Sequence, residues 1–183
     1  MENSDIALAL SIVAMVVAAL SVLVPLAIEW HRNKHKIVLS VAEVVRYVSK
    51  DGLPLLFLNI SLCNRAYIPK ILLKVEIFAP YGHKFDYADP VHDLENKICS
   101  FQLHGGLLRT QASDLGTFPL DVDPLRTRSF LIPVKLLALP EQYHESVHTR
   151  KQLKVYAIAY DEMGKAVARY DFEVDNPDYN RAK

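Results

Sequence analysis

The sequence pattern with the clearest chemical meaning is His-Glu-Ser-Val-His, which begins at His144 and ends at His148. On a helix, residues four apart share a face, so the two imidazoles could bind zinc while Glu145 acts as a general base, the zincin arrangement. The helix that would carry them covers only residues 140–150, is not the apolar helix that zincins use, and comes with no specified third ligand. We therefore interpret His144 and His148 as part of a solvated polar helix. Surface metal binding and membrane-anchored zinc hydrolysis are the alternatives.

Other patterns give catalysis no further support. An acidic stretch could place oxygen ligands around a hard cation, but its spacing fits no calcium-binding loop and lacks the glycine that such a loop needs. Its residues are Asp86, Asp89, His92, Asp93 and Glu95. The chain has six glycines and no phosphate-cradling loop, and no nucleophile stands at a recognisable spacing from a base. The sequence therefore predicts no catalytic residue, no cofactor and no metal site, and we expect a protein that is not an enzyme.

The uncharged apolar segment Ile6–Ile28 is the element around which the rest of the chain is arranged. A helix needs about 20 apolar residues to cross the hydrocarbon core, so the segment predicts a transmembrane helix after a short tail, residues 1–5. A signal peptide would need basic residues before its apolar core and a small-residue cleavage site after it, and the sequence has neither. We therefore expect a permanent anchor.

The juxtamembrane residues 29–36 predict how this helix is oriented. Arg32, Lys34 and Lys36 follow the apolar segment closely, and no basic residue precedes it. Because basic loop residues stay on the cytoplasmic side, the amino terminus should face outward and the carboxy-terminal part should lie in the cytoplasm, at the inner membrane. Trp30 falls where interfacial aromatic residues lie, so we expect these four side chains at the membrane interface.

Small side chains recur along the helix at alternating spacings of four and three residues. They are Ala7, Ser11, Ala14, Ala18 and Ser21. Such a stripe allows a second helix to approach closely, and close packing is one of the few forces that associate helices in lipid. The frequency of alanine in this segment explains the pattern equally well, so helix packing and simple composition both stay open.

Between residues 37 and 175, alternating apolar and polar residues predict strands that are separated by turns. The expected strands are residues 36–47, 54–62, 70–79, 84–87, 97–103, 107–111, 118–122, 128–137, 152–160 and 165–174. Within 70–79, the odd-numbered residues from Ile71 to Ala79 should form one face. With one short helix at 140–150, these strands predict a mainly β protein, an antiparallel immunoglobulin-like sandwich with a flexible tail at 176–183.

Composition limits the partners of this domain. The chain has 21 basic and 21 acidic residues, so its net charge of zero gives no electrostatic footprint for nucleic acid. Cys63 directly follows an expected strand and Cys99 lies within one, and free thiols are the default there in a reducing compartment; a disulfide stays open if the orientation is reversed. Tyr and Arg are enriched where interfaces carry binding energy. Candidate protein contacts in the loops are therefore Arg65, Tyr67, Arg126 and Arg128.

Three stretches together resemble a known class of proteins. They are the juxtamembrane Trp30–Lys34, the segment LFLNISLCNRAYIPKILLKVEI that begins at Leu56, and the segment LKVYAIAYDEMGKAVARYDFEV that begins at Leu153. In pattern they are similar to a widespread class of uncharacterised bacterial single-pass membrane proteins with a small immunoglobulin-like domain. The resemblance implies a fold and a layout, and it implies no catalytic or binding residues.

These features predict a protein that works by binding. We expect an accessory or structural subunit of a larger membrane complex, whose helix packs in the bilayer and whose sandwich makes cytoplasmic contacts. The alternative is a self-associating membrane sensor or effector, for instance in stress or phage defence, which would use the same helix stripe. The expected partners are the lipid bilayer and either integral-membrane proteins or further copies of the chain.

Overall fold

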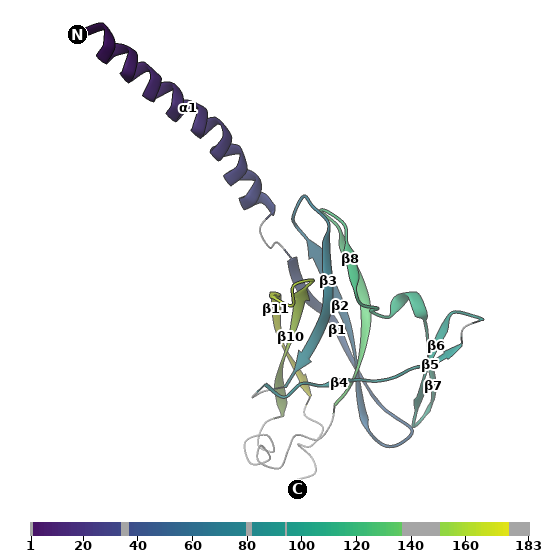
Figure 1. Ribbon diagram of the computed structural model, residues 1–183. Helices are drawn as coiled ribbons and strands as arrows, with labels where there is room; N and C mark the ends of the chain where they lie inside the picture. The colour runs from purple at the N-terminus through teal and green to yellow at the C-terminus, as the bar shows by residue number, and fades with distance from the viewer. Residues whose placement is uncertain (1, 34–36, 80–81, 94, 137–150, 176–183) are drawn as a thin grey trace.

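The computed structural model describes residues 2–33, 37–79, 82–93, 95–136 and 151–175. It begins with a long helix, α1 (Glu2–Asn33), which projects from one end of a β domain (Figure 1). The strands are β1 (Ile37–Val48), β2 (Pro54–Asn64), β3 (Lys70–Phe78), β4 (Asp86–Tyr87), β5 (Val91–Asp93), β6 (Ile98–Leu103), β7 (Gly106–Gln111), β8 (Leu120–Val122), β9 (Thr127–Lys135), β10 (Gln152–Asp161) and β11 (Ala166–Asp175), with a 3-10 turn at Ala112–Asp114.

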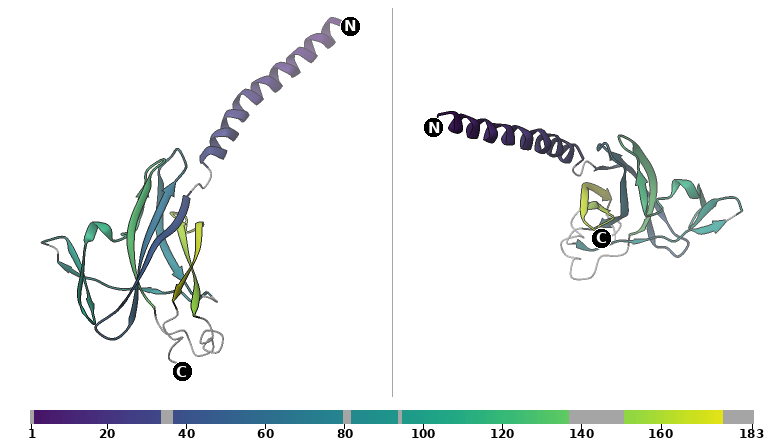
Figure 2. Two further views of the ribbon diagram at one scale, coloured as in Figure 1. Left: turned by 180° about the vertical axis from the view of Figure 1, so that it is seen from behind. Right: turned by 45° about the horizontal axis from the view of Figure 1, so that its top comes forward.

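Two four-stranded sheets form the sandwich. One has the order β1-β2-β9-β4 and the other has the order β11-β10-β3-β8. Every neighbouring pair within them is antiparallel, and two further views show the domain from behind and with its top tilted forward (Figure 2). The predicted antiparallel, mainly β sandwich behind one apolar helix is confirmed. The short helix predicted at 140–150 lies outside the described residues.

The main core lies between the two sheets. Successive side chains of a strand point to opposite faces, so a spacing of two residues places apolar side chains on one face. On the inner faces of β2 and β9 this alternation holds as predicted, and it continues to Leu136, just past the end of β9. The buried residues are Leu56, Leu58, Ile60, Leu62, Phe130, Ile132, Val134 and Leu136. Burying each such side chain contributes about 2 kcal/mol relative to leaving it in water.

The first part of strand β2, from Leu55 to Leu58, is buried on both of its faces. A third, three-stranded sheet of order β5-β6-β7 contributes Phe101, which packs with Leu55 and Phe57 in a second apolar cluster. The Phe57 and Phe101 rings meet edge to face, with centroids 4.9 Å apart. The sequence predicts the β6-β7 hairpin, but only the fold places it against the outer face of β2.

Strand β3 changes phase near its start, and here the predicted alternation is wrong. Leu72 is fully buried, whereas Ile71 and Leu73 are 42% and 43% exposed; from Val75 onward the odd-numbered residues point inward as expected. The cause is a β-bulge, because Lys74 pairs with Tyr160 while Leu72 pairs with the next residue, Asp161. An extra residue in one strand turns the following side chains to the opposite face.

A buried carboxylate on β3 joins one lysine of the same strand to a second lysine in the connection to β4. Glu76 is 8% exposed, and its Oε1 accepts hydrogen bonds from the Nζ atoms of Lys74 and Lys84, each at 2.7 Å. Burial by itself raises the pKa of the Glu76 carboxyl, but the two hydrogen bonds and the lysine charges outweigh it. The pKa therefore lies below its ordinary value of 4.5.

This lowered pKa makes Glu76 a source of acid sensitivity. The unfolded chain binds the proton more tightly, so the stabilisation is complete above the ordinary value of 4.5 and is lost as the pH falls through the lower folded-state pKa. We expect the difference in unfolding free energy between the parent and Glu76→Gln to shrink over that range in denaturant titrations of the full chain in mild detergent. Because both lysines are about half exposed, added salt should reduce it too. If the stability of the Glu76→Gln protein depended on pH as that of the parent does, Glu76 would not be the source of the acid sensitivity.

Candidate membrane-proximal binding surface

Helix α1 is mainly apolar, and it is exposed from Ile6 to Arg32. Its span Ile6–Arg32 is long and apolar enough to cross a membrane, and none of its apolar window is buried against the rest of the described chain. The five predicted packing residues (Ala7, Ser11, Ala14, Ala18 and Ser21) are all exposed. The hydroxyl of Ser21 donates to the Ala18 carbonyl at 2.7 Å, so its polar group is satisfied within the helix. By length and composition this helix suits a membrane anchor or a signal sequence.

The end of the helix meets the loop between β2 and β3. The Arg32 guanidinium lies 4.2 Å from the centre of the Tyr67 ring, a cation–π contact. A hollow of about 490 Å³ separates Pro25, Ile28 and Glu29 of the helix from Tyr67 and Ile68 of the loop. Of the four predicted interface residues, Trp30 is 65% exposed and Arg32 makes this contact, while Lys34 and Lys36 lie outside the described residues.

Asn64 fixes the shape of this loop. Its side chain is fully buried and fully paired: Nδ2 donates to the carbonyls of Ile68 and Val122, and Oδ1 accepts from the Ala66 N–H, each at 2.9 Å. A buried amide with every partner in place specifies one geometry, because breaking any of these bonds leaves a polar group unpaired. Asn64 thereby joins the β2-β3 loop to strand β8.

The loop between β8 and β9 is held against the β2-β3 loop by backbone hydrogen bonds. The Asn64 N–H donates to the Arg126 carbonyl at 2.9 Å, and the Leu125 N–H donates to the Ala66 carbonyl at 3.3 Å. Leu125 has a φ of 55°, which is unusual for a residue with a side chain, and it is 60% exposed. The predicted contact residue Arg126 is exposed, and Arg128 donates to the Asp121 carbonyl at 3.1 Å.

The turn between β10 and β11 presents a further exposed apolar side chain. Asp161 Oδ1 accepts hydrogen bonds from the N–H groups of Met163 and Lys165, and Gly164 adopts a φ of 72° that favours glycine. In this tight turn Met163 is 85% exposed. We call the two loops and this turn, residues 65–69, 123–126 and 162–165, the helix-proximal end of the sandwich.

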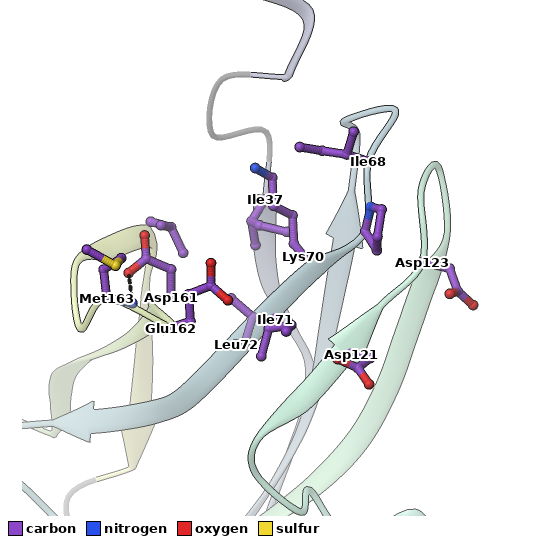
Figure 3. Close-up of a pocket in the computed structure, with 12 residues that line it drawn as sticks. Ile37, Ile68, Lys70, Ile71, Leu72, Asp121, Asp123, Asp161, Glu162 and Met163 are labelled. Atoms are coloured by element: carbon purple, nitrogen blue, oxygen red, sulfur yellow. Dashed lines mark hydrogen bonds between the residues drawn. The ribbon is translucent and has the colours of Figure 1, made fainter. Parts of the chain in front are cut away.

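A hollow of about 630 Å³ opens between these segments (Figure 3). Asp161, Glu162 and Met163 lie on one side of it and Asp121 and Asp123 on the other. Between them lie Ile37, Ile68, Lys70, Ile71 and Leu72, and the lining also includes Pro69 and Val167. Most of its lining is therefore apolar, while four carboxylates and one lysine stand around it, a combination that suits a segment with apolar and basic side chains.

Among the described residues, the other chemical candidates do not gather into a site. The segment with His144, Glu145 and His148 lies outside the described residues. No three His, Cys, Asp or Glu side chains come together as a metal site in the described part of the chain. Cys63 and Cys99 are free, and Cys99 Sγ lies 3.1 Å from Nδ1 of His92.

Sequence reasoning missed Leu125, Met163 and the hollow. Leu125 follows a proline and Met163 precedes a glycine, so each stands at a turn where an exposed side chain is expected to be polar. An apolar residue at such a position is the signal that could have identified them.

No family model matches this sequence, and no curated protein matches it. Among solved structures, the chain is similar to a candidate lipoprotein (ycdA) from Bacillus subtilis subsp. subtilis str. 168, with a TM-score of 0.44 and 11% sequence identity. The match covers 78% of this chain and 37% of that one, so the chain spans well under half the length of that protein.

Proposed function

We propose that this chain is a non-enzymatic, single-pass membrane protein that serves as an accessory subunit of a larger membrane complex. In this proposal α1 packs in the bilayer against an integral-membrane partner. The amino terminus faces outward, and the sandwich holds a cytoplasmic segment of that partner in the hollow that opens between its helix-proximal segments. The hollow of about 630 Å³ is the observation that carries the proposal, because it opens at the end of the sandwich to which the helix is attached.

The placement and lining of the hollow support this role. Only three residues separate the end of α1 at Asn33 from the start of β1 at Ile37, so the sandwich stays close to the membrane that would hold the helix. A segment that emerges from the bilayer beside α1 could therefore reach the hollow directly. Basic residues are common in cytoplasmic loops next to membrane spans, and the carboxylates around the hollow are complementary to them.

Affinity purification from native membranes tests the proposal. The full chain carries a tag at its carboxy terminus, membranes are dissolved in mild detergent, and co-purifying proteins are identified by mass spectrometry. We expect a fixed set of integral-membrane proteins at constant stoichiometry. Ile71→Glu, inside the hollow, should release them, whereas Leu73→Glu should not. Leu73 is a matched control because it lies on the same strand, is equally exposed and does not line the hollow. Recovery of the chain alone would reject the accessory role.

A self-associating sensor or effector is the second candidate, and the exposed small-residue face of α1 favours it. Replacing Ala14 and Ala18 by leucine should abolish contact between copies, because larger side chains prevent the backbones from approaching. Cross-linking of the full chain in native membranes measures the change. Ala9→Leu and Ala19→Leu lie off the stripe and should leave association intact. Unchanged cross-linking in the Ala14→Leu/Ala18→Leu protein would count against homotypic packing.

A further inference from the structure

The helix-proximal end of the sandwich exposes apolar side chains next to the last turns of α1. Tyr67, Ile68, Leu125 and Met163 are 53%, 40%, 60% and 85% exposed. They come from three separate connections, and each connection is fixed by hydrogen bonds: the Asn64 side chain, the Leu125–Ala66 backbone bond and the Asp161 side chain. Single exposed apolar residues are ordinary on a protein surface. These four differ because they lie together at one end of the sandwich.

That position coincides with the boundary of the apolar helix. Tyr67 lies under Arg32, and Ile68 faces Ile28 and Pro25 across the smaller hollow. Ile28 is the last residue of the uncharged segment, and Arg32 follows one turn later. If α1 crosses a bilayer, residues at this level lie at the headgroups, and the loop beside them lies at the same level. Leu125 is joined to that loop through Ala66, so it belongs to the same surface.

The charges at this end indicate what kind of lipid contact it can make. Among the described residues, the basic ones at this end are Arg32, Arg65, Lys70, Arg126 and Lys165, and the acidic ones are Glu29, Asp121, Asp123, Asp161 and Glu162. With both signs mixed, the described part of this surface has no excess positive charge to attract anionic lipid. Apolar insertion, which depends on the area removed from water, is the contribution that remains.

We propose that Tyr67, Ile68, Leu125 and Met163 insert into the headgroup layer of the bilayer that holds α1, so that the sandwich rests on the membrane surface in one orientation. This inference rests on the proposed membrane anchoring of the helix. It adds a second, peripheral membrane contact that would orient the hollow of about 630 Å³ toward segments leaving the same membrane.

Fluorescent labels on the full chain, reconstituted in phosphatidylcholine vesicles, test the contact. Cys63 is replaced by serine and Cys99 is fully buried, so a single new cysteine carries an environment-sensitive dye. The test position is Leu125→Cys. The control is Leu107→Cys, a leucine with a matching 57% exposure on β7 in the small sheet, which lies away from α1 (Figure 1). Labelling of the background protein without a new cysteine measures any reaction at Cys99.

We expect dye at position 125 to shift its emission to the blue and to be quenched by brominated lipid several-fold more strongly than dye at position 107. Adding phosphatidylglycerol or salt should leave this ratio unchanged, because the charges are balanced. Equal, water-like emission at both positions would overturn the proposal. So would a result in which the dye at position 125 is shielded from water only when anionic lipid is present. Shielding found only in native membranes would also overturn it and would assign the surface to a protein partner.

A parallel carbonate extraction separates this proposal from the one on which it rests. If the protein stays in the membrane but the dye at position 125 is exposed to water, only the surface contact is disproved. Protein that carbonate releases disproves the anchor, and the surface contact with it. The accessory role is decided independently by the purification from native membranes.

Discussion

Replacing Asn64 by alanine should lower the free energy of unfolding of the full chain by about 3 kcal/mol, the largest effect that we expect from one polar side chain. The Asn64 side chain is fully buried and makes three hydrogen bonds to backbone groups, to the carbonyls of Ile68 and Val122 and to the N–H of Ala66. The alanine variant leaves these groups without their partners, and each buried unpaired group costs about 1–3 kcal/mol. Some rearrangement of the loop will recover part of that sum.

Denaturant titration in mild detergent, followed by circular dichroism, measures the loss. Asn59→Ala is the matched control, since Asn59 lies on the same strand, is only half-buried and makes no side-chain hydrogen bond within the described residues. We expect the control to cost less than about 1 kcal/mol. Equal effects of the two substitutions would show that Asn64 does not hold the loop.

The Asn64→Ala variant has a consequence for the membrane contact too. Because Asn64 joins the β2-β3 loop to β8, loosening it frees the segment that carries Leu125. Dye at position 125 should then become more exposed to water, while dye at position 107 should not change.

Replacing Gly116 by alanine should destabilise the fold by about 2 kcal/mol through overpacking. A Cβ atom at this position would lie 2.5 Å from Cδ2 and 2.9 Å from Cε2 of Phe130. The Phe130 ring cannot move away easily, because it is 5% exposed and packs edge to face against Phe118 with centroids 5.7 Å apart. The Gly116 N–H also donates to the Leu131 carbonyl, which holds the backbone in place.

A double-mutant cycle distinguishes this clash from a general effect of the glycine. Phe130→Leu removes the ring atoms that the new methyl group would meet, so the two substitutions together should cost less than the sum of their separate costs. Gly105→Ala is the matched control, since a Cβ there meets no atom within 4 Å and its φ is not in the left-handed region. Additive costs in the cycle would rule out the contact with Phe130 as the cause.

The exposed residues of the helix-proximal end connect these stability predictions to function. Leu125 adopts a left-handed φ of 55°, and such strain in a residue with a side chain is kept only where the surrounding structure enforces it. The hydrogen bonds to Ala66 and between Asn64 and Arg126 provide that enforcement. The chain therefore stabilises a conformation that holds an apolar side chain in solvent, as a membrane contact would require.

Sequence alone determined the features of this protein that depend on neighbouring residues. The uncharged run Ile6–Ile28 predicts one long apolar helix, and alternation at β2 and β9 predicts strands with one face in the core. Both patterns are local, because helical and strand periodicity follow from the backbone geometry of a few successive residues. The mainly β, antiparallel class follows from several such strands with turn residues between them.

Tertiary structure decided which distant segments meet. The hairpin β6-β7 was predictable, but its packing on Leu55 and Phe57 depends on a sheet that forms elsewhere in the chain. The bulge in β3 arises from its pairing with β10, more than eighty residues away in the printed sequence, and it moves Ile71 into the wall of the hollow. In the sequence, Asn64 looks like an ordinary turn residue. Only the tertiary structure brings the Val122 carbonyl within hydrogen-bonding distance of its side chain. Pairing across such separations is settled by satisfied hydrogen bonds and shared burial, which no local pattern in the sequence records.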